Sequence, residues 1–272
     1  MVRKLVKYDF MSFFRLLFPV QLILLGIALI NRMIQFFETK DSVAYESAFT
    51  SSIVLLVIAC IAALVMTVIL SIVRFYQGLY SSEGYLSHTL PVTESQHIFS
   101  KLLVSMLFVL GTLFSIFLSV CVATFGEVNI ELFKAAGFLF GKLFTETGVH
   151  GAFFILELLL TALFYAANIL LVFYFCISIG QLAPRKKILL AFGVFFGLYA
   201  LMQITSTVMV IVFSVNPEIL DKLMEMIKEI FEKRQYLGMH LVFIIPMAAE
   251  MIVSVIFFFI NRLIMKKKLN LA

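Results

Sequence analysis

The sequence contains few charged residues. Asp, Glu, Lys and Arg make up 14% of its 272 residues, whereas soluble domains contain about 25%. Hydrophobic residues make up 62% of the chain, and the mean hydropathy is +1.09. These values exclude both a water-soluble globular domain and a disordered chain.

The sequence also lacks the common motifs of enzymes. It has no Gly-x-Ser-x-Gly elbow, no His-Glu-x-x-His zinc helix and no Gly-x-x-x-x-Gly-Lys phosphate loop. Three cysteines lie in apolar stretches without metal-like spacing, and we interpret them as small apolar residues: Cys60, Cys121 and Cys176. Four histidines are expected to be separate polar groups in loops: His88, His97, His150 and His240. We therefore expect no catalytic residue, metal site or cofactor in this chain.

The apolar residues are concentrated in six stretches, each long enough to cross a bilayer as a helix. The stretches are residues 16–37, 50–73, 102–125, 151–179, 188–215 and 241–265. The expected fold class is therefore an all-α polytopic membrane protein, with residues 1–272 forming a single transmembrane domain.

Basic residues indicate the orientation of this domain. With a cytoplasmic N-terminus, thirteen Lys and Arg fall on the inner side and eight on the outer side, as the positive-inside rule favours. Six spans then place the C-terminus in the cytoplasm as well. The net charge of +5 reflects this orientation and does not indicate nucleic-acid binding.

Three segments outside the spans have helical amphipathic patterns. Residues 1–15 predict an interfacial helix on the inner leaflet, followed by a turn at Pro19; alternatively, its basic residues only fix orientation. Within the outer segment 216–240, residues 217–234 predict an amphipathic helix with Glu218/Lys222 and Glu229/Lys233 pairs. Residues 130–144 have a weaker pattern. Each outer helix is interpreted as a re-entrant or lid element, or as an ordinary interfacial helix.

Several polar residues lie inside the expected spans, where an unpaired carboxylate costs about 3 kcal/mol on insertion scales. Four of them are candidates for the lining of a cargo path: Glu157, Asn168, Gln203 and Glu250. Glu157 and Asn168 are eleven residues apart and so share one helical face. The alternative is that these groups only form hydrogen bonds between helices.

The inner segment 74–101 is rich in aromatic residues and nearly balanced in charge, which is typical of a protein-docking surface. Its expected anchors are Tyr76, Leu79, Tyr80, Tyr85, Leu86 and Leu90, and Glu83 adds a charge. The alternative is a short amphipathic helix against lipid.

Two strings of residues resemble a known family. They are Arg74-Phe-Tyr with Glu83-Gly-Tyr-Leu and Thr89-Leu-Pro-Val, and Ser178-Ile-Gly-Gln-Leu before a basic turn. With six spans and an amphipathic start, the chain resembles permease subunits of type-2 ABC transporters from Gram-positive bacteria. The resemblance implies a plasma-membrane permease in which segment 74–101 is a cytoplasmic coupling helix. It further implies that Glu83, Gly84, Tyr85 and Leu86 contact a separate ABC ATP-binding subunit, which would hold ATP and Mg.

The resemblance also implies that a second copy or a related permease completes the pathway. We therefore expect a subunit of an ATP-driven exporter that moves an amphipathic peptide, an antibiotic or a lipid-like cargo outward, with a role in antimicrobial peptide resistance. An alternative is a membrane sensor or assembly subunit that recruits a cytoplasmic regulator. An embedded enzyme is disfavoured by the missing motifs.

Overall fold

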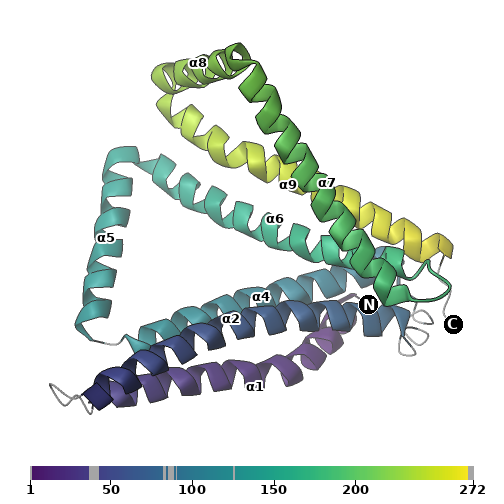
Figure 1. Ribbon diagram of the computed structural model, residues 1–272, viewed down its shortest axis with the longest axis horizontal. Helices are drawn as coiled ribbons and strands as arrows, with labels where there is room; N and C mark the ends of the chain where they lie inside the picture. The colour runs from purple at the N-terminus through teal and green to yellow at the C-terminus, as the bar shows by residue number, and fades with distance from the viewer. Residues whose placement is uncertain are drawn as a thin grey trace. The chain divides into compact units, whose positions relative to one another are not determined.

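The computed structural model describes residues 2–36, 43–81, 84, 89, 91–124 and 126–268. Throughout these residues the regular structure is helical (Figure 1). The long helices are α1 (Val2–Phe36), α2 (Val43–Tyr80), α4 (Glu94–Ala123), α6 (Val149–Gly180), α7 (Lys187–Val215) and α9 (Gln235–Lys268). Two further helices, α5 (Glu127–Thr147) and α8 (Pro217–Lys233), lie between them in sequence.

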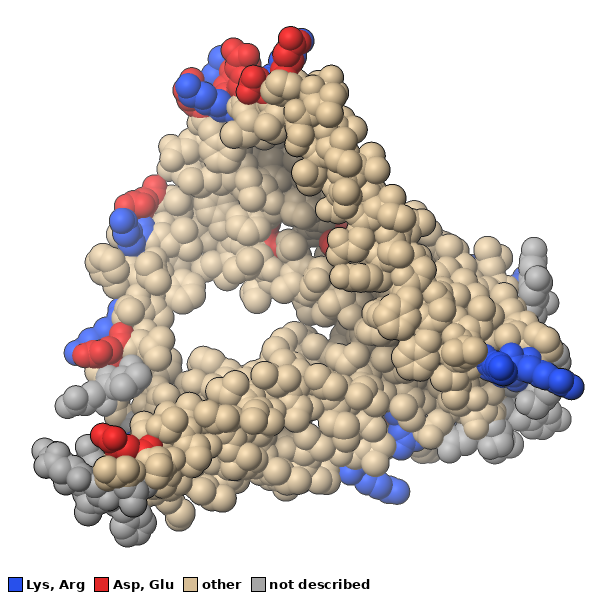
Figure 2. Space-filling view, viewed as in Figure 1, with Lys and Arg blue, Asp and Glu red and all other residues tan. Residues whose placement is uncertain are grey.

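The six long helices confirm the predicted number of candidate spans. Each is long and apolar enough to cross a membrane, and each contains one of the six predicted apolar stretches, apart from Thr124, which follows the end of α4, and residues 37 and 125, which lie outside the described part of the chain. In Figure 2, charged side chains gather over α8 and near the ends of long helices. Between their ends, the visible surface of the helices is formed mainly by uncharged residues, as expected for a multi-pass membrane protein.

The chain divides into two compact units, Met1–Gly141 and Lys142–Ala272. The first unit contains α1, α2 and α4, which pack against one another (Figure 1). Its apolar core joins Leu24 and Ala28 of α1 to Leu56 and Ala63 of α2 and to Ala123 of α4. Small residues at three of these positions allow the helices to approach closely.

Polar contacts define the directions of the helices in the first unit. Near the start of α1, Asp9 accepts a hydrogen bond from Ser100 (2.7 Å) and forms an ion pair with Lys101 (3.2 Å), at the start of α4. Near the end of α1, the Gln35 side chain donates a hydrogen bond to the carbonyl oxygen of Ala123, at the end of α4 (2.7 Å). The helices α1 and α4 are therefore parallel.

The helix α2 is antiparallel to both. Asn31, near the end of α1, donates to Ser52, near the start of α2 (2.9 Å). The hydroxyls of Thr67 and Thr112 join α2 to α4 (2.8 Å). Within a membrane such bonds satisfy polar groups that lipid cannot.

The N-terminal segment differs from the prediction. No turn occurs at Pro19, and α1 remains helical from Val2 to Phe36. Phe13 and Leu17 are buried against Val104 and Phe108 of α4, so this face of the N-terminal segment contacts protein. Pro19 removes one backbone hydrogen-bond donor from the helix. The packing of Phe13 and Leu17 on α4, together with the Asp9–Lys101 ion pair, stabilises α1 as a continuous helix despite this loss.

The second unit contains α6, α7, α8 and α9. The most extensive packing is between α6 and α9, and α7 returns along α6, with stacked Phe173 and Phe195 rings 5.4 Å apart. At the turn between α6 and α7, a Cβ on Gly180 would lie 2.8 Å from the carbonyl oxygen of Lys187 and 2.8 Å from Ala191 Cβ. The Ser178-Ile-Gly-Gln-Leu string thus has a packing role, because only glycine fits this close approach.

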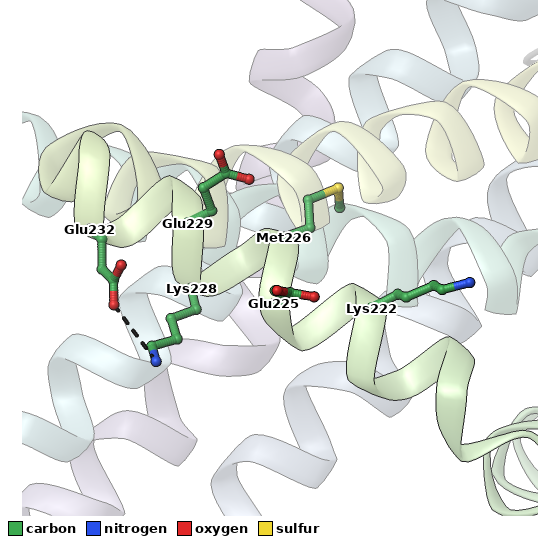
Figure 3. Close-up of a pocket in the computed structure, with 6 residues that line it drawn as sticks. All are labelled: Lys222, Glu225, Met226, Lys228, Glu229 and Glu232. Carbon is green, nitrogen blue, oxygen red and sulfur yellow. Dashed lines mark ion pairs between the residues drawn. The ribbon is translucent and has the colours of Figure 1, made fainter.

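The predicted amphipathic helix in segment 216–240 is confirmed as α8. Only Asn216 separates it from α7, and only Arg234 separates it from α9. Glu229 and Lys233 form one of the two predicted pairs, and Lys228 and Glu232 form a pair that was not predicted, at 3.7 Å. Side chains of α8 alone line a shallow depression of about 400 Å³, and Figure 3 shows these side chains as sticks. We interpret the depression as a furrow between long exposed side chains, because no other element contributes a wall.

Candidate functional site

The candidate site is a row of polar side chains between α6 and α9, which we call the polar seam. Its members on α6 are His150, Glu157 and Asn168, and its members on α9 are His240, Glu250 and Asn261. The two helices run parallel, because residues near the start of each are in contact and so are residues toward the end of each. The seam therefore follows the length of the helix pair.

At the start of the seam, three titratable side chains are connected in series. Glu157 Oε1 lies 2.8 Å from Nδ1 of His240, and Nε2 of His240 lies 3.0 Å from Nδ1 of His150. The side chains of Glu157 and His240 are 14% and 15% exposed. Low exposure strengthens these contacts, because water competes little for the same atoms.

Aromatic rings surround the two imidazoles. The ring of Tyr236 stacks on His150 with centroids 4.5 Å apart and planes 7° apart. Its hydroxyl donates to the carbonyl oxygen of Glu146 (3.1 Å), which ties the start of α9 to the end of α5. Phe154 covers the ring of His240 at 4.4 Å. These rings hold the imidazole planes in place without bonding to their nitrogens.

In the middle of the seam, Asn168 of α6 donates a hydrogen bond to the Glu250 carboxylate of α9. This pair accounts for two of the intramembrane polar residues that the sequence singles out. Toward the far end, Asn261 donates to the carbonyl oxygen of Leu171 at 3.4 Å, a long bond. Pairing across the interface offsets part of the cost of placing these groups in an apolar helix pair.

The seam has unused hydrogen-bonding capacity. Glu157 Oε2, Asn168 Oδ1 and Asn261 Oδ1 are buried and have no hydrogen-bond partner among the described residues. A buried acceptor without a partner costs about 1–3 kcal/mol. Each of the three acceptors would gain a hydrogen bond from a donor that reached the seam.

Gln203 is not part of the seam. Its side chain is exposed on α7 and donates to the Tyr199 hydroxyl of the same helix (3.1 Å). Glu157, Asn168 and Glu250 lie on the α6–α9 interface, whereas Gln203 lies elsewhere, so the structure brings three of the four residues together. Gln203 was grouped with the others because it is a polar residue inside a predicted span. Position along a span does not indicate which neighbouring helix a residue faces.

The two seam histidines were interpreted as separate loop groups, and that interpretation is wrong. Both lie in helices and are hydrogen-bonded to each other. His97 also lies in a helix, α4, and is buried, and His88 lies outside the described residues. A signal was present in the sequence: His150 precedes Glu157 by seven residues, two helical turns, so both lie on one face of α6.

The structure describes only part of the expected ATPase contact. The helix α2 extends through Tyr76 to Tyr80, so these two residues belong to a long helix. Tyr80 is only 8% exposed, so it packs inside the first unit and is not an accessible anchor. The predicted contacts Glu83, Tyr85, Leu86 and Leu90 lie outside the described residues.

Gly84, the remaining predicted contact, has a structural reason to be glycine. Its backbone N–H donates to the carbonyl oxygen of Ser81 (2.8 Å). A Cβ at this position would lie 2.6 Å from the backbone carbonyl of Leu79. The start of α4 is fixed in turn by the Gln96 side chain, which accepts a hydrogen bond from the backbone N–H of Thr93 (3.1 Å).

Comparison of the chain with protein-family models, with curated proteins and with solved structures finds no match.

Proposed function

We propose that the chain is the membrane-spanning permease subunit of an ATP-driven exporter, with the polar seam as its cargo-handling element. The observation that carries this proposal is the set of buried, unpartnered acceptors at Glu157, Asn168 and Asn261 within an otherwise apolar helix pair. A cargo with amide or ammonium donors would satisfy them. An amphipathic peptide, an antibiotic or a lipid-like molecule combines such donors with apolar surface.

The energy source in this proposal is a separate ATP-binding subunit that docks on segment 74–101. Support comes from the resemblance of that segment to the coupling helix of type-2 ABC permeases. It also comes from the position of the segment between α2 and α4, whose ends it joins. A push on the segment would be transmitted to both helices and, through the Asp9–Lys101 ion pair, to α1. A second permease copy or a related permease would complete the pathway.

Cargo handling is tested by substitutions in the seam. Asn168→Leu and Glu250→Leu each remove a polar group from the seam. We expect either change to lower the export of cargo, or the resistance of the cells to a toxic cargo, at least fivefold. Gln203→Leu is the matched control, because Gln203 is a polar residue in a span helix outside the seam. Full export by both seam variants, at wild-type expression, would exclude cargo handling by the seam.

Energy coupling is tested by charge reversal in segment 74–101. Glu83→Lys should reduce recovery of the ATP-binding subunit with the purified permease, and should reduce ATP hydrolysis by the complex, because a lone carboxylate at an interface contributes to partner specificity. Glu218→Lys in α8 is the matched control with the same charge change. A wild-type chain that transports cargo without any associated ATPase would contradict the proposal and favour a different energy source. A chain that recruits a regulator without transport would favour the sensor or assembly alternative.

A further inference from the structure

The series Glu157, His240 and His150 connects α6 to α9 through two hydrogen bonds, and together these bonds define where the ring protons are. When Glu157 is ionised, its carboxylate only accepts hydrogen bonds, so Nδ1 of His240 then carries a proton and donates it to Glu157 Oε1 (2.8 Å). A neutral imidazole has one N–H, so Nε2 of His240 is then an acceptor.

The same reasoning applies to the next ring. Because Nε2 of His240 accepts, the contact at 3.0 Å requires Nδ1 of His150 to carry a proton and donate it. Nε2 of His150 is left as an acceptor at the start of the series. Both N–H bonds thus point in one direction, from His150 towards Glu157.

From this geometry we infer that His150, His240 and Glu157 form a proton relay that delivers a proton to the buried Glu157 carboxylate. A proton from water binds Nε2 of His150. The Nδ1 proton of His150 moves to Nε2 of His240, and the Nδ1 proton of His240 moves to Glu157 Oε1. One proton enters and one carboxylate becomes a carboxylic acid, and both rings finish neutral with their proton on Nε2. Transfer in the opposite direction restores the starting state.

The surroundings favour transfer along this series. Tyr236 lies against the face of the His150 ring and Phe154 lies 4.4 Å from the His240 ring centroid, so neither competes for a ring nitrogen. His150 is half-buried, whereas Oε2 of Glu157, at the other end of the series, is buried. The distances of 2.8 and 3.0 Å are within the range for proton transfer between hydrogen-bonded groups.

Other titratable groups on the neighbouring elements are engaged or exposed. In α5, Glu146 pairs with Lys142 at 3.7 Å, and both side chains are more than half exposed. In α8, every described Asp, Glu and Lys is exposed. In α7, Lys187 lies at the helix start and Tyr199 is exposed. In α9, Arg234 just before the helix is exposed and Glu250 is bonded to Asn168.

Delivery of a proton would change the charge of the seam. Glu157 Oε2 is buried without a partner among the described residues, so the carboxyl group has a second oxygen that can accept a hydrogen bond. Neutralising it removes a negative charge from an apolar helix pair and with it the attraction for a cationic group. The relay thus makes the polarity of the seam depend on proton supply at His150. It requires only the α6–α9 contacts, and it does not depend on the identity of the cargo or on an ATPase.

Infrared difference spectroscopy after a jump from about pH 8 to about pH 6, a range in which exposed carboxylates with pKa values of about 4 stay ionised, tests the relay on the full chain in lipid nanodiscs. We expect the C=O stretch of a protonated carboxylic acid to appear in the wild-type protein and to be lost in Glu157→Gln. His240→Asn and His150→Asn should slow its appearance by about tenfold or more, because each removes a proton carrier. Glu146→Gln, a nearby exposed carboxylate outside the series, is the matched control and should leave the band unchanged.

Two results would overturn the inference. A band that persists in Glu157→Gln would place the proton on another group, and an unchanged rate in both histidine variants would mean that Glu157 is protonated directly. If a variant does not fold, ¹⁵N spectra of the histidine-labelled wild-type chain decide the question. Both His150 and His240 should carry the proton on Nδ1 at neutral pH, whereas a proton on Nε2 of His240 in that state would contradict the relay.

Discussion

At Gly180, α6 lies close to the backbone of α7. Gly180→Ala would place a methyl group 2.8 Å from both the Lys187 carbonyl oxygen and Ala191 Cβ. The carbonyl belongs to the backbone and cannot rotate away, so the helices must separate. We expect a loss of about 1–3 kcal/mol in the free energy of unfolding, measured by reversible denaturation in mixed micelles. Gly193→Ala in α7 is the control, because a Cβ there has no neighbour within 4 Å.

An unchanged free energy of unfolding in Gly180→Ala would mean that the turn between α6 and α7 relaxes at no cost. A loss of equal size in Gly193→Ala would instead indicate a general effect of replacing a helical glycine by alanine. The Ser178-Ile-Gly-Gln-Leu string would then lose its packing explanation.

At single residues, the sequence identified Glu157, Asn168 and Glu250 as polar groups that need a reason to lie in a span. It did not identify their partners, because helical periodicity places residues on a face but does not say which helix covers that face. The link between Glu157 and His240 spans 83 positions in the sequence. Only the packing of α6 on α9 brings these residues together.

Among helices, the contact between α1 and α4 depends on a buried ion pair. The side chains of Asp9 and Lys101 are 17% and 9% exposed. Asp9→Asn leaves the Lys101 charge without its counter-ion, and we expect it to cost about 3 kcal/mol in the free energy of unfolding. Adding Lys101→Met should recover part of this loss, because no buried charge then remains. Reversible denaturation of the two variants and the wild type measures the difference.

The exposed pair Lys142–Glu146 provides the control for this ion pair. Its side chains are 58% and 64% exposed, so Lys142→Met should change the free energy of unfolding by less than about 0.5 kcal/mol. A double variant of Asp9 and Lys101 that is less stable than Asp9→Asn would contradict the role of the unpaired charge. It would show that the packing of the Lys101 side chain matters more.

The existence of the long helices was easier to predict than their limits. Continuous apolar composition indicated all six candidate spans, and four-residue charge spacing indicated α8. The turn at Pro19 was wrong because tertiary packing of Phe13 and Leu17 on α4 outweighs a local proline signal. Packing of this kind depends on residues about ninety positions away, which no local pattern contains.

Over the whole molecule, each unit repeats one arrangement. The first and third long helices are parallel and the second is antiparallel, in α1, α2 and α4 and again in α6, α7 and α9. The arrangement requires the start of α1 and the start of α4 to lie on one side of the membrane, and likewise the starts of α6 and α9. The contacts determine which helix ends share a side within each unit, and the distribution of basic residues predicts which side is cytoplasmic.

Cysteine labelling in intact cells tests that orientation. In a background with Cys60, Cys121 and Cys176 replaced by alanine, we expect Glu225→Cys in α8 to react with a membrane-impermeant maleimide, because its side chain is exposed on the predicted outer side. Lys7→Cys, also exposed but at the start of α1, should react only after the cells are opened. Reaction of Lys7→Cys in intact cells together with protection of Glu225→Cys would reverse the topology. It would also move His150, at the start of α6, from the outer to the cytoplasmic side, and the relay would then draw its protons from the cytoplasm.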